Sequence, residues 1–183
     1  MIWTRINKGE TLAREMADGH YTRQTPGHPM WTRPGYNFAL MALFKGGGRG
    51  LFCWWRPKWE DGRPGTSRKD KLRVLECTMF RREGRTPLAS VMIEAAVDAL
   101  SSPEGAADLH LYSAGPINQL ITGVSSNKTA KCRSRGSLPG QCYLHAGWEK
   151  LDKAGGKADV WLCRPWENPF HQLQPPTAQL PLF

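Results

Sequence analysis

Short apolar runs separated by glycine- and proline-rich stretches form the basic pattern of the chain. Residues 9–18 carry apolar side chains at helical spacing and predict a short helix that ends at Gly19. Residues 37–44 and 51–56 are apolar runs joined by a glycine-rich segment. We interpret this segment as a hairpin turn, because the alternative, a phosphate-binding loop, usually opens a helix rather than a strand.

The middle of the chain predicts a strand followed by the best helix of the sequence. Residues 71–80 alternate as a strand, which puts Glu76 and Phe80 on one face and Cys77 on the other. Thr86 suits the helix N-cap position, and apolar residues then recur at helical spacing through Leu100. The remaining expectations are a strand at 108–113, a polar loop at 114–139, a short helix at 141–146 and strands at 148–151 and 159–163.

Strands that alternate with helices favour a layered α/β domain, a single mixed central sheet flanked by helices. We place this domain at residues 1–164. Residues 165–183 contain five prolines and predict a tail that forms neither a long helix nor a central strand.

Composition removes several classes of protein. No apolar run approaches the roughly 18–20 residues that a membrane span needs, and residues 1–10 lack the apolar core of a secretory signal. We therefore expect a cytoplasmic protein with no membrane contact. Five cysteines without a Cys-x-x-Cys pair predict free thiols rather than disulfides. The Cys142-x-x-His145 spacing does not complete a set of four zinc ligands, so no metal is expected.

The 183 residues carry a net charge of +9, and the excess is clustered. Clustered cations attract polyanions, which suggests nucleic acid or, alternatively, a phosphate-bearing ligand. Trp54 and Trp55 are adjacent in a predicted strand, so one is expected in the core and the other, Trp55, on the surface, where it could stack on a base. The other candidate nucleic-acid-binding residues are Tyr21, Arg23, Arg68, Lys69, Lys131, Arg133 and Arg135.

The order of elements resembles the GNAT acyltransferase fold. A strand at 71–80, a turn at 81–86 and a long helix stand where that family has its phosphate-binding turn, and residues 143–148 (Tyr-Leu-His-Ala-Gly-Trp) are similar to the family's Tyr-x-x-x-Gly-Phe sequence. A narrower resemblance is to phage GNAT-like proteins related to Mom DNA-modification enzymes. It rests on the segments 20–23 (His-Tyr-Thr-Arg), 61–62 (Asp-Gly), 80–83 (Phe-Arg-Arg-Glu) and 139–148.

This resemblance implies a transferase that modifies an exocyclic amine of a DNA base, uses acetyl-CoA or another acyl-CoA, and protects phage DNA from restriction in the bacterial host cell. It places the general acid at Tyr143. It also places the segment with His20 near the acceptor, where His20 could act as the base. The residue pattern adds Glu76 as another candidate base and Ser113 as an orienting group. A helix N-terminus beside arginines favours a phosphate. The cofactor-binding candidates are accordingly Arg81, Arg82, Gly84, Arg85 and Thr86.

Two departures from the family pattern leave other functions open. The turn has only Gly84 where relatives have a glycine pair, and the predicted strand 108–113 ends on Ser113 where relatives have an aspartate. Both favour a GNAT-shaped module that binds nucleic acid without catalysis. A third hypothesis is an acetyltransferase that acts on a protein or small molecule, with the positive charge serving coenzyme A. No pattern in the sequence sets an oligomeric state.

Overall fold

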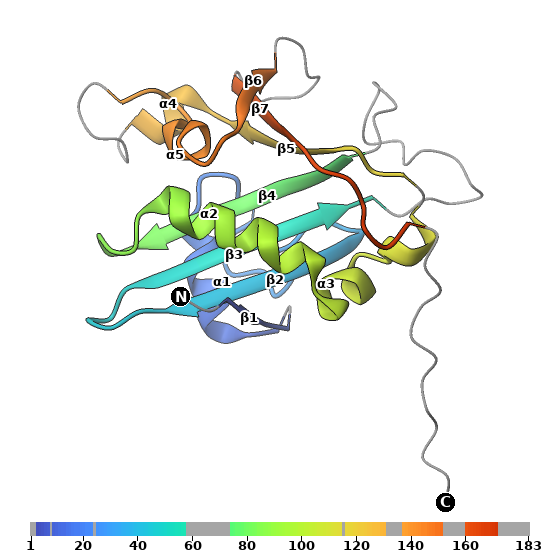
Figure 1. The fold of residues 1–183 in the computed structure, drawn as a ribbon. Helices are drawn as coiled ribbons and strands as arrows, with labels where there is room; N and C mark the ends of the chain where they lie inside the picture. The colour runs from blue at the N-terminus through green and yellow to red at the C-terminus, as the bar shows by residue number, and fades with distance from the viewer. Residues whose placement is uncertain are drawn as a thin grey trace, which may run out of the picture.

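The computed structural model describes residues 3–7, 9–23, 25–57, 74–114, 116–130, 137–151 and 160–171. They form a mixed α/β fold in which helices cover both faces of one seven-stranded sheet (Figure 1). No helix in these ranges is long and apolar enough to cross a membrane.

The sheet has the strand order β1-β2-β3-β4-β5-β7-β6. Neighbouring strands are antiparallel except β4 and β5, which are parallel. The strands are β1 (Thr4–Arg5), β2 (Tyr36–Leu43), β3 (Arg49–Arg56), β4 (Val74–Glu83), β5 (Gln119–Val124), β6 (Glu149–Leu151) and β7 (Val160–Pro165). The predicted hairpin is confirmed, because β2 and β3 pair along their whole lengths.

The helices divide the core into two main layers. On one face α1 (Thr11–Asp18) packs Ala13 and Met16 against Met41 and Leu51. On the other face the larger cluster gathers around Trp54. It is covered by α2 (Ala89–Asp98), the 3₁₀ turn η1 (Ala99–Ser101) and α3 (Pro103–Asp108). Both strands of the hairpin are therefore buried on both sides, which explains why their sequences are apolar runs rather than alternating patterns.

A β-bulge at Thr78 changes which side chains of β4 share a face. Trp54 opposes Cys77 while Cys53 opposes Met79, so β4 carries one extra residue at Thr78. Cys77 packs into the α2 layer and Met79 into the α1 layer. The alternation predicted for 71–80 was therefore wrong beyond Cys77: Phe80 contacts the α2 layer and does not share a face with Glu76.

Two further expectations were wrong. The segment 108–113 is not a strand: α3 ends at Asp108, and residues 111–113 form the 3₁₀ turn η2 (Leu111–Ser113). The Ser102 hydroxyl accepts a hydrogen bond from the Gly105 N–H, and Pro103 stands in the first turn, so these two residues begin α3. The predicted polar loop 114–139 contains β5, whose Leu120 and Ile121 are fully buried.

The parallel pair β4 and β5 separates at its centre. Residues 74–77 of β4 pair with residues 119–122 of β5, ending at Cys77 and Thr122. Beyond that point β4 continues beside β3, and β5 continues beside β7. Figure 1 shows the two strands diverging toward the side where α5 (Gln141–Leu144) lies. The divergence opens the middle of the sheet, and the main candidate site lies there.

The predicted tail begins inside the packed structure. β7 extends to Pro165, and Phe170 packs edge-on against Tyr112 with ring centroids 5.2 Å apart. Asn168 is buried and donates its side-chain N–H to the Leu111 carbonyl. Residues 165–171 therefore close one end of the core. The rest of the predicted tail, 172–183, lies outside the described residues.

Candidate functional site

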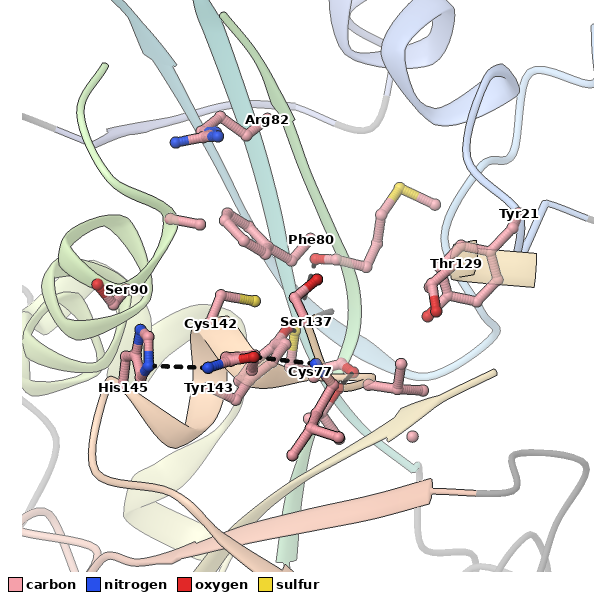
Figure 2. Close-up of a pocket in the computed structure, with 18 of the residues that line it drawn as sticks. Tyr21, Cys77, Phe80, Arg82, Ser90, Thr129, Ser137, Cys142, Tyr143 and His145 are labelled. Carbon is pink, nitrogen blue, oxygen red and sulfur yellow. Dashed lines mark hydrogen bonds between the residues drawn. The ribbon is translucent and has the colours of Figure 1, made fainter. Parts of the chain in front are cut away.

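A cavity of about 440 Å³ lies where β4 and β5 diverge, and we call it the sheet cavity (Figure 2). Residues 77–80 of β4 and residues 122–124 of β5 line two of its sides. Helix α5 and the start of α2 close it on one layer, while His20 and Tyr21 reach it from the segment after α1. Residues from six separate segments therefore meet at one opening in the sheet.

Tyr143 is held at the base of the sheet cavity by the short helix α5. Gly140 begins this helix with a left-handed backbone (φ 74°), and the Trp148 N–H donates back to the Tyr143 carbonyl. The ring packs edge-on against both Phe80 and Trp148, with centroid distances of 6.1 and 5.0 Å. The phenol oxygen lies 3.2 Å from the Cys77 sulfur.

Burial keeps both of these groups neutral. Desolvation raises the pKa of Tyr143 well above its ordinary value, and the nearby thiols of Cys77 and Cys142 add to the shift. Burial also raises the pKa of the Cys77 thiol. At neutral pH the pair is thus a phenol beside a thiol. Such a phenol is a proton donor, and the thiol is not a ready nucleophile because nucleophilic attack needs the thiolate.

His20 lines the sheet cavity as an uncharged imidazole. Burial lowers its pKa to about 4; a backbone hydrogen bond from the ring to Phe80 opposes this shift, and the charge of Arg81 adds to it. Nδ1 lies 2.8 Å from the Thr22 hydroxyl and accepts the Thr22 N–H. Both ring nitrogens are engaged, so His20 fixes the segment after α1 against β4.

The arginine-rich segment is strand rather than turn. Arg81 and Arg82 belong to β4, and α2 begins after an N-cap at Leu88, not at Thr86 as predicted. The Arg82 guanidinium donates to the carbonyls of Arg85 and Pro87, which holds the connecting segment outside the helix. Arg82 is the member of the predicted cofactor set that lines the sheet cavity, and Figure 2 shows it above Phe80.

The other cofactor candidates lie beside the sheet cavity. Arg81 forms an ion pair with Glu83 and approaches the end of α1 at Gly19. Gly84, Arg85 and Thr86 form an exposed turn, in which Gly84 has the positive φ of 99° that a side chain would strain.

Two predicted catalytic residues lie away from Tyr143. Glu76 is buried on the opposite face of β4 from Cys77 and forms an ion pair with Arg33 at 2.8 Å. Ser113 is exposed in η2, where its hydroxyl donates to the His110 carbonyl. Neither residue lines the sheet cavity. The structure thus brings together Tyr143 and His20 and separates them from Glu76 and Ser113.

The residues predicted to contact nucleic acid lie in different surroundings. The prediction that Trp55 lies on the surface was wrong: it is buried like Trp54, because the segment 33–35 covers it, with its Nε1 donating to the Pro34 carbonyl and the Arg33 guanidinium 5.5 Å from its ring. The Arg23 side chain has its partners within the protein: its guanidinium donates to Asp18 and to the carbonyls of His28 and Met30. Tyr21 lines the sheet cavity and packs against His20 with ring centroids 4.4 Å apart. Arg68, Lys69, Lys131, Arg133 and Arg135 lie outside the described residues.

Sequence reasoning missed several residues that line the sheet cavity, notably Cys77, Gln141 and His145. The Gln141 side chain lies 3.2 Å from the His145 ring and accepts the Leu138 N–H, as the dashed lines in Figure 2 show. The spacing 141–145 places both side chains one helical turn apart, a signal that the sequence carried. Cys77 gave no such signal, because only the strand divergence exposes it to the cavity.

Two features of the sheet cavity bear on which ligands it could hold. The first turn of α2 has no side-chain cap, and Ala89 and Ser90 of that turn line the cavity together with Arg82. Uncapped N–H groups beside a guanidinium suit a phosphate. The edge of β4 beyond Cys77 has no strand partner on the β5 side among the described residues, which suits an amide-containing chain.

Among the residues that the structure describes, no group of three or more histidine, cysteine, aspartate or glutamate side chains is placed to hold a metal ion. Comparison with known protein families, with curated proteins and with solved structures gives no match for this chain.

Proposed function

We propose that this protein is a GNAT-like transferase that moves an acyl group to the exocyclic amine of a DNA base and thereby protects phage DNA from restriction. The observation that carries the proposal is the neutral phenol of Tyr143 at the base of the sheet cavity, between the diverging strands β4 and β5. The reaction would take place inside the cavity rather than on the protein surface.

The topology of the sheet supports the GNAT-like assignment. A parallel pair at the centre of an otherwise antiparallel sheet, opened by a bulge in its first strand, gives a ligand access to the middle of the fold. The strand before the opening leads into α2, and the segment 143–148 follows the second strand of the pair, in the order that the sequence resemblance implies.

An acyl-CoA bound there supplies an activated acyl thioester. Arg82 and the first turn of α2 would hold its phosphates, and the open edge of β4 beyond Cys77 would hold its amide chain. As the amine nitrogen bonds to the acyl carbon and the C–S bond breaks, Tyr143 would give its phenol proton, retained through burial, to the departing sulfur; the proton that the amine loses would pass to solvent, from which the phenol regains one. His20 positions Tyr21 at the other side of the cavity.

Charge supports DNA as the acceptor. The chain carries a net charge of +9, and polyanion binding by such an excess is dominated by phosphate contacts. The aromatic residue of the predicted DNA-contacting set that lines the sheet cavity is Tyr21. Reaction at a duplex base requires the base to leave the stack, and an aromatic ring beside the reaction centre can hold it.

The test is to express the protein with a plasmid, digest the DNA to nucleosides and measure their masses. We expect a new, heavier nucleoside whose yield falls by about 10²-fold or more in Tyr143→Phe, since a positioned general acid contributes on the order of 10²–10⁴-fold. Tyr112→Phe is the matched control, because Tyr112 packs against Phe170 and does not line the sheet cavity.

Three outcomes contradict the proposal in different ways. Unmodified DNA together with salt-sensitive DNA binding identifies a binding module without catalysis. Tight acetyl-CoA binding without DNA affinity identifies an acetyltransferase with another acceptor. If Tyr143→Phe modifies DNA as fully as the parent does, Tyr143 is not the general acid. A loss of activity supports a role of Tyr143 in catalysis only if the free energy of unfolding of Tyr143→Phe lies within about 1 kcal/mol of that of the parent. This margin is the contribution of one hydrogen bond.

A further inference from the structure

A second cavity, of about 260 Å³, adjoins the bulge in β4, and we call it the loop cavity. Its wall is formed by residues of the segment 22–34, and Cys53 and Met79 contribute from the sheet. Met79 and Cys53 belong to the layer that packs against α1. Thr78 and Met79 line both the loop cavity and the sheet cavity, so the two cavities meet at the bulge.

The wall of the loop cavity is fixed by internal bonds. The Arg23 side chain, only 6% exposed, forms an ion pair with Asp18 and donates to the carbonyls of His28 and Met30. Asp18 also accepts the Gly27 N–H. Ordering a segment of this length costs conformational entropy, so a wall held in this way is preformed for a ligand.

Two buried polar groups in this wall have no partner. Trp31 and Thr32 line the loop cavity and are 4% and 8% exposed. Neither the indole Nε1 of Trp31 nor the hydroxyl of Thr32 has a hydrogen-bond partner in the described part of the chain. A buried polar group left unpaired costs about 1–3 kcal/mol, and native structures rarely keep two side by side without a use for them.

These groups specify the chemistry of a ligand. The indole N–H can only donate and the hydroxyl can donate, so the two adjacent residues call for acceptor atoms such as a carbonyl oxygen or a ring nitrogen. Arg33 adds a cation at the same cavity, partly balanced by its ion pair with Glu76. The volume is below the roughly 300–1,000 Å³ of pockets for drug-sized ligands, which favours a single ring system.

We propose that the loop cavity binds a small planar heterocycle through hydrogen-bond acceptors on one of its edges, with Trp31 and Thr32 as the donors. Resting on the proposed function, this heterocycle is a single nucleobase, held in a cavity that shares Thr78 and Met79 with the sheet cavity. Met79 and Cys53 supply an apolar floor for the ring. Base identity is then read by the loop cavity, and the transfer chemistry belongs to the sheet cavity.

The indole N–H of Trp31 provides a direct readout by nuclear magnetic resonance. The chain has eight tryptophans, and the Trp31 side-chain signal is assigned by its loss in Trp31→Phe. Each of the four 2′-deoxynucleosides is titrated into the full-length protein to 10 mM, followed by a mixed-sequence single-stranded oligonucleotide. We expect at least one nucleoside to shift the Trp31 signal in a saturable way, and the oligonucleotide to shift the same signal.

Thr32→Val separates a ligand-binding role from a structural one. We expect binding to weaken about two- to tenfold, the effect of one lost hydrogen bond, while the free protein unfolds at the same or a higher temperature. The stability gain is expected because the substitution removes an unpaired buried hydroxyl at nearly constant shape. Thr4→Val is the matched control, since Thr4 is exposed on β1.

The outcomes separate this proposal from the proposed function. If no nucleoside and no oligonucleotide shifts the Trp31 signal, or if Thr32→Val binds as well as the parent, the loop cavity is not a base site, whatever the DNA-modification assay shows. A shift by the oligonucleotide alone assigns binding to the DNA backbone and also overturns the proposal. Saturable nucleoside binding without DNA modification would support the loop cavity as a base-binding site and would contradict the proposed transferase activity.

Discussion

The two halves of strand β4 have different surroundings. Residues 74–77 pair with β5, and residues 76–77 also pair with β3, whereas residues 79–83 pair with β3 alone among the described residues. The first half contributes fully buried side chains such as Leu75, and the second half contributes partly buried ones such as Phe80 and Arg82. The same strand is therefore core in one half and cavity wall in the other.

The difference arises at a single residue. The bulge at Thr78 turns Met79 toward α1 and Phe80 toward α2. The pairing of β4 with β5 ends at the residue before the bulge, where Cys77 opposes Thr122. A bulge breaks the ladder locally and increases the twist of its strand, so the partner strand can separate there. Side chains of the second half then face ligands instead of neighbouring strands.

Truncation of one apolar side chain in each half tests this contrast most strongly. We expect Leu75→Ala to lower the free energy of unfolding by about 2–5 kcal/mol, because it leaves a void in a closed core. Phe80→Ala should cost less, about 1–2 kcal/mol, because its side chain borders an existing cavity. Urea unfolding measures both. Equal losses would mean that the second half is packed as tightly as the first.

The pH dependence of stability tests whether His20 is buried against the second half of β4. His20 contacts the backbone of Phe80, and its pKa is lowered by burial to about 4. Above pH 6.5 the imidazole is neutral in both the folded and the unfolded chain. As the pH falls from about 6.5 to about 4, only the unfolded chain takes up this proton, so stability falls by about 1.4 kcal/mol for each pH unit.

The variant His20→Gln removes this proton uptake. Its free energy of unfolding should depend less steeply on pH between 6.5 and 4 than that of the parent, as measured by urea unfolding at several pH values. His145→Gln is the comparison variant, because it makes the same substitution at an exposed histidine. Parallel slopes for His20→Gln and the parent would show that His20 is protonated equally in both states.

The smallest effect is expected at the end of β4. Glu83 forms ion pairs with Arg49 and Arg81 in which all three side chains are about 30% exposed. Solvent screens such pairs, so Glu83→Gln should change the free energy of unfolding by at most about 1 kcal/mol, and the difference should shrink in 1 M salt. A loss above about 2 kcal/mol that persists in salt would show that this end is closed from solvent.

Local sequence patterns predicted the parts of the fold that depend on neighbours along the chain. The helix expected at 9–18, the hairpin of β2 and β3, and the short helix ending before Gly147 are all confirmed. Each has a local cause: helical spacing, a glycine turn, and a glycine with positive φ (74°). The same patterns failed at 108–113, where the expected strand is instead the end of α3 and the turn η2.

The candidate site was predictable only in part. Tyr143, His20 and Arg82 were chosen from the sequence, and all three line the sheet cavity. Whether they act in transfer is a prediction for the Tyr143→Phe experiment. Glu76 was chosen on the expectation of a regular strand, yet its carboxylate lies on the other face of β4 and is bound by Arg33. Trp55 was expected on the surface because alternation alone does not reveal a second covering layer.

The sequence by itself determined the α/β class, the hairpin, and the residues that carry polar chemistry around positions 20, 82 and 143. These follow from periodicity, turn residues and charge, which act over a few positions. The tertiary structure decided where β4 separates from β5, which layer Met79 and Phe80 join, and that Trp31 and Thr32 are buried together. These depend on strand pairing and burial between segments far apart in the chain, and no local pattern contains that information.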